Sequence, residues 1–271
     1  MDIGELRKQP HLSFSAINEY LMCGLKYWFS RIEKVPPEFV PDNLVFGRCI
    51  HQVLEEYNNS RLIGEIPPLP TLTGIFETCW DKAVEEEAIQ YSKGKGYKSL
   101  RREGAALIKH FYENRQPEEY NILAIEEPFS LEVDGLPYPI IGIIDLIEED
   151  DAGTIIITDY KTTGRSFSQP EVDSNLQLTL YQLAMGQNGF SSRDMILKLD
   201  CLIKTRTPKY EQYYTVRAKK DMQRLLNIIQ LVLKGISNEV FVPTSTGWMC
   251  SNCAYKTYCD QWLMENSYET Q

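Results

Sequence analysis

The sequence lacks any apolar run close to the roughly 18 residues that a membrane-spanning helix needs, so we expect no membrane association. Its first residues have neither the basic segment nor the apolar stretch of a secretory signal, which predicts a protein of a reducing cytoplasm. Basic residues are also scarce, with 28 Lys and Arg against 38 Asp and Glu and a net charge of −10. At face value this deficit argues against a nucleic-acid partner, because phosphate contacts need Lys and Arg.

Apolar and aromatic residues are plentiful, at 43% and 11% of the 271 residues, which excludes a wholly disordered chain. Seven cysteines in a reducing compartment indicate metal binding before disulfides. The charge is unevenly distributed: residues 116–158 contain eleven acidic residues and no basic one, whereas residues 193–234 contain ten basic residues against four acidic ones. Residues 93–102 add five basic residues. One acidic block is therefore flanked by two basic stretches.

Hydrophobic spacing predicts a mostly helical region followed by a mixed α/β core. We expect helices after Leu12, after Gly47, and at about 72–90, 100–114, 172–186 and 219–236. We expect strands at 121–125, 129–133, 139–147, 154–161, 197–203 and 213–217. The central order is α-βββ-α-β, which predicts a mixed sheet with helices on it. We divide the chain into residues 1–115, 116–242 and 243–271, all within one compact domain.

The acidic hairpin around residues 148–153 carries the most specific signal. If its turn centres on Ala152, Asp145 and Asp159 lie directly opposite each other, where Cβ atoms are about 5 Å apart. Lys161 projects from the same face as Asp159, and Tyr160 from the other. Two carboxylates and an ammonium could hold a divalent ion beside a phosphate and an attacking water. An isolated Asp-x-Lys is usually a surface contact, but both acids interrupt or end apolar runs, where a carboxylate needs a partner.

These residues resemble a known family. Gly142-Ile143-Ile144-Asp145 followed by Asp159-Tyr160-Lys161-Thr162 is similar to the metal-binding core of the PD-(D/E)XK nucleases, in the RecB-type branch. The resemblance implies a restriction-endonuclease-like αβββαβ core. It also implies further site residues: His51 in a Gly-x-x-x-His element, Gln177 and Tyr181 in a Gln-x-x-x-Tyr pair, and Glu126 on the first strand. Glu126 carries the least weight, since exposed acids are common on edge strands.

The resemblance implies hydrolysis of phosphodiester bonds by a metal-activated water. The implied ligands of Mg²⁺ or Mn²⁺ are His51, Asp145, Asp159 and the main-chain carbonyl of Tyr160. Lys161 would orient or deprotonate the water and offset charge on the phosphate. An imidazole ligand suits Mn²⁺ as well as Mg²⁺.

Three cysteines near the C-terminus, Cys250, Cys253 and Cys259, form C-x2-C-x5-C, and Cys23 is the expected fourth ligand of one metal centre. This arrangement resembles the iron–sulfur subset of the family, including the AddB-type nuclease domain and the small CRISPR-adaptation exonuclease. The resemblance implies a [4Fe–4S] cluster acting as a structural clasp. Spacing alone leaves a four-cysteine zinc site open. The other cysteines are expected to be buried packing residues: Cys49, Cys79 and Cys201.

Two functions remain as hypotheses. The first is a metal-dependent exonuclease acting on single-stranded DNA or DNA ends, in recombination and repair, phage DNA processing or CRISPR spacer acquisition. An integrase, helicase or recombination protein would then be a partner, in a bacterial, archaeal or phage-infected cell. The second is an inactive relative that binds nucleic acid or a partner and carries structural zinc. Basic stretches with interleaved tyrosines, at 93–102 and 204–217, fit single-stranded nucleic acid or an ordinary solvated face equally well.

Overall fold

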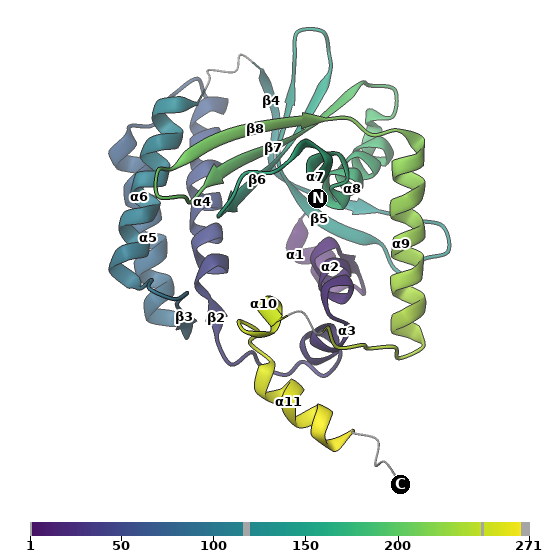
Figure 1. Ribbon diagram of the computed structural model, residues 1–271. Helices are drawn as coiled ribbons and strands as arrows, with labels where there is room; N and C mark the ends of the chain where they lie inside the picture. The colour runs from purple at the N-terminus through teal and green to yellow at the C-terminus, as the bar shows by residue number, and fades with distance from the viewer. Residues whose placement is uncertain (1, 116–119, 245–246, 267–271) are drawn as a thin grey trace.

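A mixed sheet forms the centre of the computed structural model, which describes residues 2–115, 120–244 and 247–266 (Figure 1). Within these residues the strands of this sheet run in the order β1-β5-β6-β7-β8, and β4 pairs with β5. The β6–β7 and β1–β5 pairs are parallel, and the others are antiparallel. The strands are β1 (Leu12–Ser13), β4 (Asn121–Leu131), β5 (Ile140–Glu149), β6 (Ile155–Thr163), β7 (Met195–Ile203) and β8 (Lys209–Thr215). The predicted fold class is thereby confirmed.

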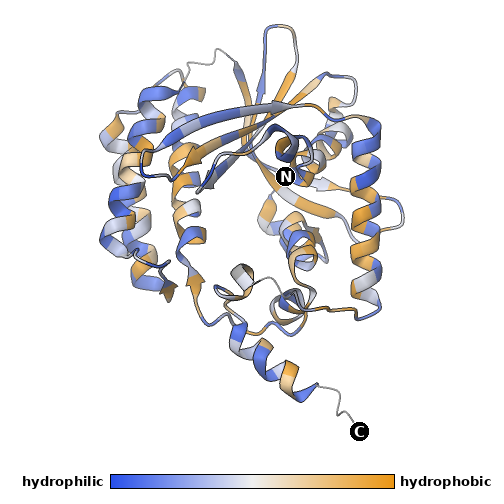
Figure 2. Ribbon diagram, in the orientation of Figure 1, coloured by the Kyte–Doolittle hydropathy of each residue, from blue (hydrophilic) through white to orange (hydrophobic). Residues whose placement is uncertain are grey.

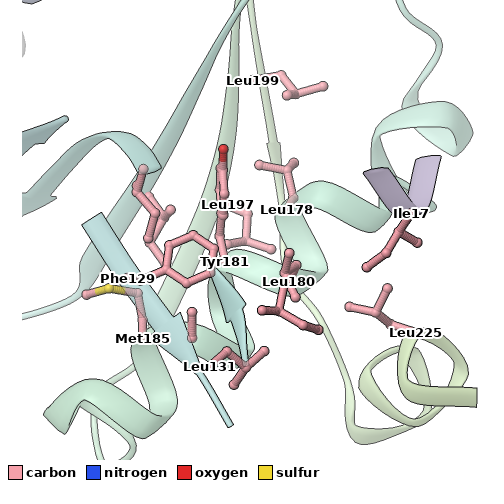
Figure 3. Packing of buried hydrophobic residues seen from close by; sticks show 14 of the residues in the cluster. Ile17, Phe129, Leu131, Leu178, Leu180, Tyr181, Met185, Leu197, Leu199 and Leu225 are labelled. Carbon is pink, nitrogen blue, oxygen red and sulfur yellow. The ribbon is translucent and has the colours of Figure 1, made fainter. Parts of the chain in front are cut away.

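Helices cover both faces of the sheet, because the central strands carry apolar side chains on both of their faces. One core joins the sheet to α2 (Phe14–Met22), α8 (Leu176–Met185) and α9 (Lys219–Ser237), as Figure 3 shows for part of its side chains. The second core joins the other face to α4 (Asp42–Leu62), α5 (Leu69–Glu86) and α6 (Tyr97–Asn114). The hydropathy colouring in Figure 2 shows orange segments in the central strands and alternating blue and orange along the helices that cover them.

The hairpin between β5 and β6 has the predicted register. Leu146 pairs with Thr158 and Glu149 with Ile155, which places the centre of the turn at Ala152. Asp150 shapes the turn by accepting hydrogen bonds from the backbone N–H groups of Ala152 and Thr154. Gly153 supplies the left-handed residue that the turn needs, with φ of +83°.

Other predicted elements differ in their bounds. The strands expected at 121–125 and 129–133 form one strand, β4, which runs through Pro128. The helix expected after Gly47 begins at Asp42, whose carboxylate is buried and accepts hydrogen bonds from Ser92. The helix expected at 172–186 is interrupted at Asn175, whose side chain caps α8 by accepting from the Leu178 N–H.

A small third core around Leu25, Phe29 and Tyr255 joins a segment from the first 40 residues to one from the last 20 described residues. The rings of Phe29 and Tyr255 stack with centroids 6.1 Å apart.

The remaining elements are α1 (Ile3–Lys8), α3 (Gly24–Tyr27), the π-helical turn η1 (Trp28–Ile32), β2 (Val40–Pro41), β3 (Ile89–Gln90), α7 (Gln169–Asp173), η2 (Gly186–Phe190), α10 (Gly247–Cys250) and α11 (Lys256–Glu265). Among the described helices, none combines the length and the apolar character needed to cross a membrane.

Candidate active site

The candidate site lies where β5 and β6 separate. The antiparallel pairing of the two strands ends at Leu146 and Thr158, and one further step of this register would pair Asp145 with Asp159. Instead, the Asp145 Oδ2 atom accepts a hydrogen bond from the Tyr160 N–H at 2.7 Å. Both carboxyl groups are buried, with Asp159 only 1% exposed. The separation of the strands thus leaves two buried carboxylates at one point of the sheet.

Helix α4 brings His51 to this point from another part of the chain. Its Nε2 atom lies 3.1 Å from the Tyr160 carbonyl oxygen, and its Nδ1 atom lies 3.8 Å from Asp145 Oδ2. Ligand atoms of His51, Glu126 and Asp145 all lie within 4.8 Å of one another, close enough to hold one metal ion. The structure therefore brings together His51, Asp145 and the Tyr160 carbonyl, which the family resemblance names as candidate metal ligands.

Glu126 was the residue that the sequence supported least. It faces Asp145 across the β4–β5 pair, because Ile125 pairs with Leu146 and Glu127 with Ile144. Its φ of +49° is unusual for a residue other than glycine, and such backbone strain is concentrated at functional sites. A left-handed residue inside an extended strand leaves no mark in the hydrophobic pattern, so the sequence could not reveal it.

Lys161 and Asp159 are held by side chains of α8. The Lys161 Nζ atom lies 2.6 Å from Asp159 Oδ2 and donates to Gln177 Oε1 at 2.9 Å. Gln177 donates to the Tyr181 hydroxyl at 2.7 Å, and that hydroxyl donates to Asp159 Oδ1 at 3.4 Å. The four side chains form a closed ring of polar contacts. Tyr181 enters it from the apolar core in Figure 3.

Burial leaves the site with negative charge that the protein itself does not fully balance. Desolvation, followed by repulsion from Asp159, raises the pKa of Asp145 to about 6. Desolvation, followed by repulsion from Asp145 and Glu55, raises the pKa of Glu126 to about 7. Burial lowers the pKa of Lys161, but Asp159 and Asp145 together with Cys201 more than offset this and keep that pKa raised. A divalent cation would relieve the repulsion between the carboxylates.

An open cleft of about 910 Å³ between α4 and α5 reaches the site at His51 and Glu126. Its basic lining residues are already paired with acids: Arg48 with Glu87, and Lys82 with Glu86 at 3.9 Å.

Several residues of the two basic stretches contribute to the fold itself. Arg101 forms ion pairs with Glu77 and Asp81, and Lys95 pairs with Glu103. Lys204 lies over the ring of Phe46, 4.5 Å from its centroid. For these residues the geometry favours the structural reading over a nucleic-acid contact.

The four predicted cluster cysteines line one cavity of about 230 Å³, and all four are free thiols. Cys23 accepts hydrogen bonds from the backbone N–H groups of Lys26 and Thr244, at 3.4 and 3.5 Å, which ties the two ends of the chain together. Among the described residues, only the His51 set brings three or more ligand atoms within 4.8 Å of one another, so no three of the cysteine sulfurs are all that close together. Four thiolates on one zinc ion would be about 4 Å apart, given Zn–S bonds of about 2.3 Å.

The remaining cysteines follow the sequence analysis only in part. Cys201 is buried, as predicted. Cys49 is also buried, but it forms a disulfide with Cys79, which links α4 to α5. Both residues pack in the core beneath α4, Cys49 fully buried and Cys79 partly buried, as expected. The disulfide itself was not predicted, because it depends on two adjacent helices that bring the Cα atoms to 5.6 Å.

Comparisons with known proteins give a family match over most of the chain. The family model described as the PD-(D/E)XK nuclease superfamily matches residues 11–260. A crystal structure named "Putative exonuclease", from Eubacterium rectale, is similar with a TM-score of 0.56 and 12% identity, covering 92% of this chain and 87% of that one. The structure of the protein SSO0001 matches with a TM-score of 0.35 and 15% identity, over 91% and 95% of the two chains. Among curated proteins, none matches.

Proposed function

The chain belongs to the PD-(D/E)XK nuclease superfamily, and on that premise we propose that it is a metal-dependent exonuclease acting on single-stranded DNA or DNA ends. The observation that carries the proposal is the meeting of Asp145, Asp159 and Lys161 where two strands separate, with His51 beside them. The neighbouring structure named as an exonuclease supports the same reading at the level of fold.

We propose that His51, Asp145, Asp159 and the carbonyl oxygen of Tyr160 hold Mg²⁺ or Mn²⁺, with Glu126 as a further ligand. The donor set fits such an ion, because carboxylate and carbonyl oxygens suit Mg²⁺ and an added imidazole suits Mn²⁺. When bound, the ion supplies an activated water and stabilises charge on the phosphate.

The protein's own groups orient the reaction. Asp159 keeps the Lys161 ammonium charged and fixed at 2.6 Å, where it can bind a phosphate oxygen or the attacking water. Gln177 accepts a hydrogen bond from the same ammonium and fixes its direction. Tyr181 donates to Asp159 and positions that carboxylate. Burial of Asp159 and Tyr181 excludes competing water from the contact between them.

We predict that Asp159→Ala or Lys161→Ala abolishes nuclease activity and leaves the fold intact. The measurement is Mn²⁺- and Mg²⁺-dependent digestion of labelled single-stranded DNA, with circular dichroism to check the fold. Lys109→Ala serves as the control, since it removes an exposed lysine from an ion pair with Glu113 within α6. Full activity in either folded site variant would overturn the assignment. A wild-type protein that cleaves no DNA at all would favour the inactive nucleic-acid-binding alternative.

The same assay identifies the type of substrate. Linear strands blocked at the 5′ or the 3′ end give the polarity, and a circular strand separates an exonuclease from an endonuclease. An RNA strand of the same sequence tests the choice of DNA.

We propose a role in recombination and repair, phage DNA processing or CRISPR spacer acquisition, in the cytoplasm, beside an integrase or helicase. Pull-down with such proteins tests the partner separately from the chemistry.

We further propose that Cys23, Cys250, Cys253 and Cys259 hold a [4Fe–4S] cluster. Their shared cavity supports one common metal centre, and the resemblance to the iron–sulfur subset favours the cluster over a single zinc ion. The cluster would supply a clasp between the chain ends. Protein purified without oxygen should be brown and contain about four iron atoms per chain. A colourless protein with one zinc ion per chain would support the alternative and contradict the cluster.

A further inference from the structure

Tyr160 connects the two faces of the sheet. Its backbone lies inside the candidate site, where its N–H donates to Asp145 and its carbonyl oxygen lies 3.1 Å from His51 Nε2. Its side chain points to the opposite face and belongs to the core beneath α4. Whatever holds this side chain therefore also sets the position of two backbone atoms in the site.

The Tyr160 hydroxyl is held by Asn58. The Asn58 Nδ2 atom donates to it at 2.9 Å, and Asn58 is fully buried. Asn58 and His51 are seven residues apart on α4, which is about two helical turns and places them on one face of the helix. The same helix thus contacts Tyr160 twice, once at its carbonyl and once at its hydroxyl. These two contacts fix the height and the rotation of α4 against β6.

The contact continues into a buried ion pair. Arg61, one turn further along α4, donates to Asn58 Oδ1 at 2.9 Å and to Glu148 Oε1 at 2.8 Å. Glu148 is 0% exposed and lies on β5, three residues after Asp145. Burial lowers the pKa of Arg61, but Glu148 more than offsets this, so the guanidinium stays charged. The network joins α4 to both strands that carry the carboxylates.

We propose that Asn58 and Arg61 are positioning residues of the metal centre, acting through the Tyr160 hydroxyl to hold His51 and the Tyr160 carbonyl around Asp145. The inference rests on the proposed function. Its physical basis is that groups behind metal ligands fix their orientation, and losing one typically weakens metal binding about 10–100-fold. Neither residue touches the reacting atoms, so neither is a catalytic residue.

The test is Mn²⁺ affinity, measured from the electron paramagnetic resonance signal of the free ion. Tyr160→Phe removes only the hydroxyl, and Asn58→Leu removes the amide at nearly constant size. We expect each single variant to raise the Mn²⁺ Kd about tenfold. The double variant should bind no more weakly than Asn58→Leu alone, because that change already removes the hydrogen bond that Tyr160→Phe removes, together with the one from Arg61. The Mn²⁺ concentration that half-activates cleavage should rise in parallel.

Thr215→Val is the matched control. It removes a buried hydroxyl from another hydrogen-bonded group, with Arg217 at 2.7 Å and Asp173 at 2.8 Å, on β8. It should lower the melting temperature without changing the Mn²⁺ Kd. Unchanged Mn²⁺ affinity in folded Tyr160→Phe, or an equal loss in Thr215→Val, would overturn the positioning role. A wild-type protein that binds no Mn²⁺ and cleaves no DNA would overturn the proposed function, and this inference with it.

Discussion

Burial sets the charge of two carboxyl groups at the metal centre before any cation binds. The pKa of Asp145 rises from 3.8 to about 6, and that of Glu126 from 4.5 to about 7. Between those pKa values and the lower values of the unfolded chain, the folded protein binds protons that the unfolded chain releases. Stability from these groups is therefore present at low pH and is lost as the pH rises through about 6 to 7.

We predict that metal-free protein melts at a lower temperature at pH 8 than at pH 5.5. The full pKa shift of Asp145 corresponds to on the order of 3 kcal/mol, at about 1.4 kcal/mol per pKa unit, but most of this is already lost below pH 5.5. The titration of Glu126, with its pKa of about 7, therefore causes most of the difference between pH 5.5 and pH 8. Mn²⁺ should reverse the trend, because it replaces the protons, so its affinity should fall as the pH drops through about 7 and then 6. Thermal melts with and without Mn²⁺ across this range measure both effects.

Asp145→Asn is the control for that titration, since it keeps the shape and removes the charge. It should remove the Asp145 titration and the repulsion that Asp145 exerts on Glu126, leave the part that burial of Glu126 causes, and abolish the gain from Mn²⁺. A wild-type protein that is more stable at pH 8 than at pH 5.5 without metal would contradict the assignment of these carboxyl groups.

Two glycines inside the helical layer give opposite expectations for one substitution. A Cβ at Gly104, on α6, would lie 2.0 Å from the ring of Phe76, which is fully buried. A Cβ at Gly74, on the adjacent α5, would meet nothing within 4 Å. We predict that Gly104→Ala destabilises the protein by about 1–3 kcal/mol through overpacking. Gly74→Ala should stabilise it by about 0.5–1 kcal/mol through helix propensity.

Urea denaturation of both glycine variants measures these changes. The pair tests how closely α5 and α6 pack, because both substitutions add one methyl group to a helix. A Gly104→Ala protein as stable as the wild type would contradict the packing of Phe76 against α6. Unchanged Mn²⁺ affinity in both variants is expected, since neither glycine contributes a ligand.

The sequence predicted those elements whose cause is local. The β5–β6 register followed from isoleucine runs around a short polar turn, and the meeting of Gln177 and Tyr181 followed from helical spacing. It did not predict the early start of α4, because the carboxylate of Asp42 is held by hydrogen bonds from Ser92, 50 residues away. Nor did it predict that β4 continues through Pro128. In the described sheet β4 pairs only with β5, and an edge strand can lack one N–H.

The same distinction holds for the site. Asp145, Asp159 and Lys161 lie on one hairpin, and their meeting was predicted from it. His51 needed the family resemblance, since 109 residues separate it from the Tyr160 carbonyl that it contacts. The Asn58–Tyr160 hydrogen bond spans 102 residues and has no local signal. A buried asparagine in an amphipathic helix gives no indication of its partner until the helix is docked.

The net charge of −10 misleads about the whole molecule because it sums groups with different roles. Acids of β4 to β6 converge on the candidate metal site, and others neutralise Arg101 and Lys95 within the helical layer. The charge that a polyanionic substrate meets is local, and a bound divalent ion would change its sign at the site. The acidic block is therefore compatible with a DNA substrate.

The closure of the chain ends is the last feature that the whole molecule makes testable. Protein contacts alone already join them: Tyr20 donates to the Val240 carbonyl at 2.6 Å, and a Cβ at Gly24 would lie 2.9 Å from the Val242 nitrogen. The cysteine centre would add a covalent closure of nearly the whole chain, which restricts the unfolded state.

We predict that Cys23→Ser removes the visible absorption and most of the iron, and destabilises the protein by about 4 kcal/mol, the scale of closing a loop of over 100 residues. Cys201→Ala, a buried cysteine far from the cavity lining, should keep both colour and iron. At low temperature the folded Cys23→Ser protein should still bind Mn²⁺, because the clasp supplies none of its ligands. Iron content and melting temperature equal to those of the wild type would show that Cys23 is no ligand and that the contacts of the chain ends suffice.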